Sequence, residues 1–174
     1  MDIEPAIHEE NMYTRAPKHL GDFGEGLVTY TLIRKGFEVA CVDHVGADLI
    51  AERQQERQHH KLAVSVKTRR YKAGSIESRG TVIEFDHLQK LEHFAKRFDL
   101  DPVFAHVVSI VDDKIIHLFM IRTEDIKNSI TPGKYGYPLN YSKKQLPLTI
   151  ALSYIDYSSW SNESIGSKLF GSVS

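Results

Sequence analysis

The sequence lacks the features that define several broad protein classes. Its 174 residues include one cysteine, Cys41, which excludes an intrachain disulfide and fits a reducing cytoplasm. No apolar run approaches the ~20 residues that a membrane-spanning helix needs. The first residues lack the basic and then apolar order of a signal peptide. The formal net charge is -1, so no global field draws the molecule to a polyanion or a membrane. We therefore expect a cytoplasmic protein without membrane contact, whose polyanion sites come from local charge clusters.

The length suits one domain with a sizeable core. No internal repeat and no linker rich in proline and serine divides the chain. We expect an N-terminal arm over residues 1–16, a single α/β domain over 17–160 and a peripheral tail over 161–174.

The spacing of apolar residues predicts the elements of this domain. Helical spacing favours one helix from about Pro17 to Lys35 and another over 88–98, with Asp86 as its N-cap and Gln89 completing a capping box. Short or alternating apolar runs predict strands at 37–42, 46–51, 62–67, 103–111 and 115–121, and the last two form a hairpin around 112–114. Between them we expect a polar loop at 52–61 and a basic connection at 68–80. The remaining expectations are a short helix at 123–127, a long loop at 131–147 and a strand or helix at 148–155. This succession, α-β-β-β-α-β-β, indicates an α/β domain with a mixed sheet flanked by helices.

Two of the expected strands carry a charged residue in apolar surroundings. Strand side chains alternate, so Asp48 shares a face with Ile50, and Ser65 and Lys67 share a face with Ala63. Burying a lone carboxylate or ammonium costs free energy unless the group is paired or bound to a metal. If the two strands pair, Asp48 and Lys67 can point into one cleft, which is the beginning of a hydrolytic metal site.

The strongest local positive charge follows directly. Lysine and arginine neutralise backbone phosphates without reading base sequence, and a tyrosine can stack on an unpaired base. We expect nucleic-acid contacts from Arg69, Arg70, Tyr71, Lys72 and Arg79. An ordinary solvated basic loop is the alternative.

The nine histidines do not form a recognisable metal motif. His59 and His60 are adjacent in sequence, and His106 and His117 lie on the expected late hairpin. No cysteine or histidine spacing resembles a zinc site, so we expect surface or core histidines.

Over roughly residues 18–121 the chain resembles the PD-(D/E)XK nuclease superfamily, which has the restriction-endonuclease-like fold. The resemblance is strongest to its Holliday-junction-resolvase-like and Mrr-like branch. It rests on Gly24-Glu25-Gly26-Leu27-Val28, Gly46-Ala47-Asp48-Leu49-Ile50 and Ser65-Val66-Lys67-Thr68 within a matching element order. The family places an acid, or sometimes Gln, where this chain has Ser65. The motif is therefore degenerate, because a hydroxyl cannot supply negative charge to a hard cation.

The resemblance implies a metal-dependent endonuclease that hydrolyses phosphodiester bonds in DNA with Mg²⁺ or Mn²⁺. Asp48 and the main-chain carbonyl of Val66 would bind the ion, and Glu25 would bind it through water or take the position vacant at Ser65. Ser65 itself could contact a metal-bound water or a phosphate oxygen. Lys67 would hold the attacking water or stabilise the developing charge.

Three alternatives remain open at this stage. A relocated acid could complete the site, and Glu77 and Glu84 are the nearest downstream candidates. The chain could instead be a catalytically degenerate relative that binds nucleic acid without cleaving it, which Ser65 favours. It could also be a protein-interaction domain that keeps only the fold. A homodimer is the assembly we expect if both strands of a duplex are cut.

Overall fold

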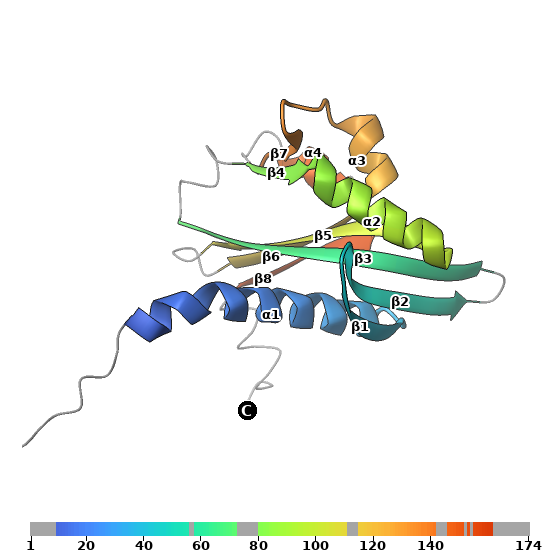
Figure 1. Cartoon of the computed structure of the whole chain (residues 1–174), viewed down its shortest axis with the longest axis horizontal. Helices are drawn as coiled ribbons and strands as arrows, with labels where there is room; N and C mark the ends of the chain where they lie inside the picture. The colour runs from blue at the N-terminus through green and yellow to red at the C-terminus, as the bar shows by residue number, and fades with distance from the viewer. Residues whose placement is uncertain are drawn as a thin grey trace, which may run out of the picture.

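The computed structural model describes residues 10–55, 58–72, 80–110, 115–141, 146–151, 153 and 155–161. Helices and strands follow one another along the chain in a mixed order (Figure 1). They are α1 (Glu10–Arg34), β1 (Glu38–His44), β2 (Ala47–Gln55), β3 (Gln58–Tyr71), β4 (Thr81–Glu84), α2 (Phe85–Phe98), β5 (Asp101–Ile110), β6 (Ile115–Arg122), α3 (Thr123–Ser129), β7 (Gly136–Leu139), α4 (Leu146–Ala151) and β8 (Ile155–Ser161).

Six strands form the main sheet in the order β1-β2-β3-β5-β6-β8, and β4 pairs with β7 in a separate small sheet. Only β3 and β5 are parallel among the paired strands of the described chain. The lengths of the connections explain this pattern. Short connections join β1 to β2, β2 to β3 and β5 to β6, whereas the chain between β3 and β5 includes α2 and so allows a parallel crossover.

The main sheet is covered on both faces (Figure 1). On one face, Val28 and Leu32 of α1 pack with Leu62 and Val64 of β3. On the other face, Leu91, Phe94 and Ala95 of α2 pack with Ala47 and Ala63. Burying each large apolar side chain contributes about 1.5–3 kcal/mol. Consecutive residues of β3 therefore face α1 and α2 in turn, which places Ser65 and Lys67 on the α2 side.

The predicted α/β class, with a central mixed sheet between helices, is confirmed. The short helix expected at 123–127 is α3, and the late hairpin is the antiparallel pair β5 and β6. Its turn at 112–114 lies outside the described residues, as does the end of the chain after Ser161. No helix among the described residues is long and apolar enough to cross a membrane.

Three predicted boundaries of helices and strands in the first half of the chain were wrong. Helix α1 begins at Glu10 and continues through Pro17, because a proline removes one backbone hydrogen bond without necessarily ending a helix. Strand β2 extends to Gln55 and β3 begins at Gln58, so most of the expected loop at 52–61 is paired strand. Strand β3 also continues to Tyr71, since β5 supplies backbone partners for its polar end.

Two further predictions were wrong after the third strand, and the structure decides a third that was left open. Asp86 does not cap α2: Glu84 is the N-cap residue, and the Asp86 carboxylate accepts a hydrogen bond from Lys90 Nζ at 2.5 Å. The expected loop at 131–147 contains β7, which forms because β4 offers it an antiparallel partner. For the segment 148–155, where either a strand or a helix was expected, the structure shows α4. The last strand is β8.

Candidate functional site

A cavity of about 300 Å³ lies between the main sheet and α2. It brings together residues from four parts of the fold, which are the β1–β2 turn with the start of β2, the middle of β3, the first half of α2 and β5. The lining residues are Val45, Gly46, Ala47, Asp48, Ser65, Val66, Lys67, His87, Lys90 and Phe104. Asp48, Ser65 and Lys67 thus share one cavity, although they come from different strands.

The β1–β2 turn forms one wall of this cavity because Gly46 allows a close approach to α2. Gly46 has a positive φ of 110°, a conformation that side chains disfavour. A Cβ atom at this position would lie 2.5 Å from the main-chain oxygen of Lys90. Glycine therefore lets the turn lie directly against the helix, which fixes the start of β2 relative to Lys90.

Asp48 is half-buried and is anchored to β3 by its side chain. Its Oδ2 accepts a hydrogen bond from the main-chain N–H of Val66 at 2.6 Å. The pairing of β2 with β3 ends at Leu49 and Val64, one residue short of Asp48. The carboxylate thus binds a backbone donor at the point where the two strands stop pairing, and this fixes its position in the lining of the cavity.

Lys67 is half-buried and lies beside His106, its register partner on β5. His106 is fully buried, its Nδ1 is hydrogen-bonded to the Tyr141 hydroxyl, and its Nε2 has no partner among the described residues. Burial, together with the nearby charges of Arg69 and Lys67, lowers the pKa of His106 to about 3. His106 is therefore a neutral core histidine beneath two cationic side chains.

Tyr141 is buried next to His106. Burial, together with the neighbouring Tyr71, raises the pKa of Tyr141 well above its usual value. Its ring stacks with Phe119 at 5.3 Å between centroids. Nothing in the sequence pointed to this pair, because His106 and Tyr141 are far apart along the chain and meet only in the folded core.

Glu25 is half-buried on α1, the helix that covers the opposite face of the sheet from α2. It is not among the residues that line the cavity. Its neighbour Gly24 lies against β3, where an added Cβ would be 1.8 Å from Thr68 Oγ1. Helix α1 thus contacts β3 next to Lys67, but on the face of the sheet opposite the cavity. The metal-binding role of Glu25 stays a prediction.

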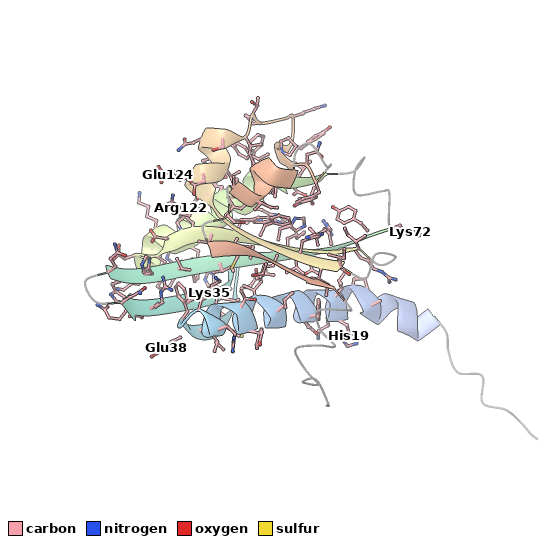
Figure 2. The ribbon with its side chains drawn as sticks, turned by 180° about the vertical axis from the view of Figure 1, so that it is seen from behind. His19, Lys35, Glu38, Lys72, Arg122 and Glu124 are labelled. Atoms are coloured by element: carbon pink, nitrogen blue, oxygen red, sulfur yellow. The ribbon has the colours of Figure 1, made fainter. Side chains whose placement is uncertain are left out.

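The basic residues after Lys67 belong to β3 and divide between its two faces. Thr68 meets α1, so alternation places Arg70 on the α1 side and Arg69 on the α2 side with Lys67. Tyr71 is half-buried and packs against the core under β4 and β7. Lys72 is exposed and lies at the opposite end of the molecule from Glu38 and Arg122 (Figure 2).

Of the two candidate replacement acids, Glu84 lies within the described residues, and it does not line the cavity. Glu84 is exposed at the N-cap of α2. Glu77 lies outside the described residues, as does the predicted nucleic-acid contact Arg79.

Two lining residues of α2, His87 and Lys90, were missed by the sequence reasoning. His87 is half-buried, and Lys90 is exposed and paired with Asp86. Their spacing of three residues places them on the same side of a helix. That signal could have paired them with each other, but not with Asp48, because the packing of α2 on the sheet decides what they face.

The donor atoms of the cavity limit the metal ion that it can hold. Asp48 supplies a carboxylate and Ser65 a hydroxyl, while Lys67 and Lys90 supply ammonium groups. In the described parts of the chain, no three His, Cys, Asp or Glu residues cluster as a metal site. Mg²⁺ can be held by a single carboxylate if water and substrate phosphate complete its shell. The site therefore fits a weakly held Mg²⁺ or Mn²⁺, and it does not fit a closed cage of protein ligands.

Comparison with known proteins identifies a shared fold. The sequence matches no family model and no curated protein. The structure is similar to that of Hjc, a Holliday junction resolvase from the archaeal hyperthermophile Archaeoglobus fulgidus, with a TM-score of 0.50 and 16% sequence identity. The similarity covers 74% of this chain and 88% of Hjc. At this identity the likeness is one of fold, namely a mixed sheet flanked by helices.

Proposed function

We propose that this chain is a nuclease-like protein that binds DNA and hydrolyses phosphodiester bonds with the help of Mg²⁺ or Mn²⁺. The observation that supports it best is the single cavity lined by Asp48, Ser65 and Lys67, in a fold similar to that of a Holliday junction resolvase. The name of that neighbour makes branched DNA the first substrate to test.

In this proposal the chain's own residues position the phosphate. Asp48 and the Val66 carbonyl would hold the ion, which when bound polarises the phosphoryl group and acidifies water. The Val66 N–H orients the Asp48 carboxylate. Lys67 donates hydrogen bonds to the phosphate oxygens, where negative charge develops, and the Ser65 hydroxyl donates a hydrogen bond to a phosphate oxygen.

The direct test is cleavage of four-way-junction, duplex and single-stranded DNA while Mg²⁺ or Mn²⁺ is titrated against a chelator. We expect metal-dependent cleavage that falls by about a hundredfold or more in Asp48→Asn and in Lys67→Gln. Asp48→Asn removes the carboxylate that would hold the ion, and Lys67→Gln removes the positive charge at the phosphate. Asp101→Asn and Lys61→Gln make the same changes at strand positions outside the cavity, and these controls should keep full activity. Cleavage that survives both cavity variants, or that needs no metal, contradicts the proposal.

Binding without cleavage is the second candidate function. It is favoured by Ser65, which leaves Asp48 as the only acidic residue in the described part of the lining, and by the two lysines Lys67 and Lys90. Salt-sensitive DNA binding with no cleavage at any metal concentration selects this candidate. A chain that neither binds nor cleaves DNA is instead a protein-interaction domain.

A further inference from the structure

The wall of the cavity opposite β3 is formed by α2. His87 and Lys90 line it there, facing a cavity that Ser65 and Lys67 line from the sheet. The Lys90 ammonium is held by Asp86 at 2.5 Å, and 47% of the Lys90 side chain is exposed. Neither residue belongs to the strand motif that suggested a nuclease, so they form a second group of donors in the same space.

The charge of the cavity favours an anion. Among the described residues, its lining includes one acidic residue, Asp48, and two lysines, Lys67 and Lys90. His87 adds a ring N–H donor and carries a positive charge when protonated. The Asp86 carboxylate pairs with the Lys90 ammonium, and Asp86 is not among the lining residues. Ammonium, imidazole and hydroxyl groups are all donors, and a phosphate group is an acceptor with several oxygens.

The size and the walls of the cavity also suit a small anion. A volume of about 300 Å³ is at the lower end of ligand sites, so it admits a phosphate group more readily than a whole nucleotide. Buried Phe104 forms part of the lining from β5. The Gly46 turn lies against the main chain of Lys90, so α2 is held in place beside β2.

We propose that His87 and Lys90 form a phosphate-binding subsite in the Asp48 cavity, and that this subsite binds phosphate without a metal ion. This inference extends the proposed function: that the phosphate belongs to DNA rests on the proposed function. Lys90 supplies a charged donor at the rim, His87 a directed N–H, and Lys67 and Ser65 donate from the opposite wall.

The test uses the full chain in the presence of a chelator. Inorganic phosphate and a short oligothymidylate are titrated separately, and side-chain resonances are followed by NMR. We expect saturable shifts at His87 and Lys90 with both probes, and about tenfold weaker binding in His87→Gln and in Lys90→Gln. Asp86→Asn should strengthen binding about threefold, because the Lys90 ammonium loses a competing carboxylate.

Matched controls lie on the same helix. His93→Gln and Lys96→Gln change exposed residues that do not line the cavity, and both should bind like the parent chain. Unfolding is monitored by circular dichroism, so that a misfolded variant is recognised. If no shift saturates, or if the controls weaken binding as much as the cavity variants, the subsite does not exist.

The two probes separate the sources of the phosphate. Tighter binding of oligothymidylate that still depends on Lys90 assigns the subsite to a nucleic-acid backbone. Phosphate binding that oligothymidylate does not displace assigns it to a small phosphorylated molecule. The binding titration contains no metal ion, so it is independent of the cleavage assay. If the chain cleaves DNA with a metal ion but binds no phosphate at His87 and Lys90, this inference alone is overturned. If it binds phosphate there but never cleaves DNA, only the proposed hydrolysis is overturned.

Discussion

Ser65 lies between two valines of β3, and its side chain lines the same cavity as that of Asp48. A hydroxyl can donate one proton and accept hydrogen bonds, but it carries no charge. Hard divalent cations are bound more tightly as the number of carboxylate ligands rises. This single residue therefore sets how strongly the cavity can hold a metal ion.

We expect Ser65→Glu to raise the affinity for Mn²⁺ by about tenfold or more, because it places a second carboxylate in the cavity of Asp48. Isothermal titration calorimetry measures the affinity directly. Ser65→Gln is the matched control, since it has nearly the same size and no charge. Equal Mn²⁺ affinities of the two variants would show that the cavity is not a cation site.

His106 makes the stability of the fold depend on pH. Because burial and the charges of Arg69 and Lys67 lower its pKa from 6.5 to about 3, the unfolded chain binds a proton at pH values where the folded chain does not. The free energy of unfolding must therefore fall as the pH falls through this range, by up to about 1.4 kcal/mol per pH unit from this residue.

We expect His106→Gln to lose that part of the pH dependence, because glutamine can still hydrogen-bond to Tyr141 but does not titrate. Urea unfolding at several pH values between 6.5 and 3 gives the slope. The exposed His93→Gln should retain the parent slope. If His106→Gln also retains it, His106 is protonated in the folded protein and the assigned neutral state is wrong.

At the scale of elements, α1 and β3 meet at a point with no room for another atom. Gly24 lies against Thr68, whose Oγ1 is buried and has no hydrogen-bond partner among the described residues. Gly26, two residues along the same helix, has open space where a Cβ would be. A Cβ atom at position 24 would therefore overlap β3, whereas a Cβ atom at position 26 would meet no other atom of the described residues.

We expect Gly24→Ala to lower the free energy of unfolding by about 1–3 kcal/mol, because the new methyl group overlaps Thr68. Gly26→Ala should raise it by up to about 1 kcal/mol through helix propensity. Thermal and urea unfolding compare the two variants. Combining Gly24→Ala with Thr68→Ala should recover part of the loss, and no recovery would place the strain elsewhere.

The sequence indicated much of this arrangement but not all of it. Alternation within β2 and β3 was enough to place Asp48, Ser65 and Lys67 in one cavity, and their chemical roles stay predictions. Alternation could not show that β3 continues to Tyr71, because the last residues of β3 pair with Ser109 and Ile110 of β5. Helical periodicity likewise gave the apolar side of each helix, but not which face of the sheet that helix covers.

At the scale of the whole molecule, the small net charge hides an uneven distribution. Lys67 and Lys90 lie in the cavity, and Arg69 lies on the same side of β3. Lys90 is paired with Asp86, and on α3 Lys127 is paired with Glu92 at 2.7 Å. DNA binding is therefore expected to depend on a few local charges.

If Lys67, Arg69 and Lys90 each neutralise one phosphate of duplex DNA, the logarithm of the binding constant should fall with the logarithm of salt concentration with a slope of about -2.7. Fluorescence anisotropy at several salt concentrations measures this slope. Arg69→Gln should reduce its size by about 0.9, whereas Arg70→Gln, on the opposite face of β3, should leave it unchanged. Equal effects of the two variants would mean that DNA does not follow the cavity side of the strand.

The parallel pairing of β3 with β5 also has a consequence for synthesis on the ribosome. Strands β1, β2 and β3 can assemble as an antiparallel meander as soon as they emerge, but the second edge of β3 must wait for Asp101–Ile110. Until then the nascent chain exposes the backbone groups beside Leu62–Val66. Such an edge is prone to pair with other chains, so the fold is most vulnerable to aggregation at this stage of translation.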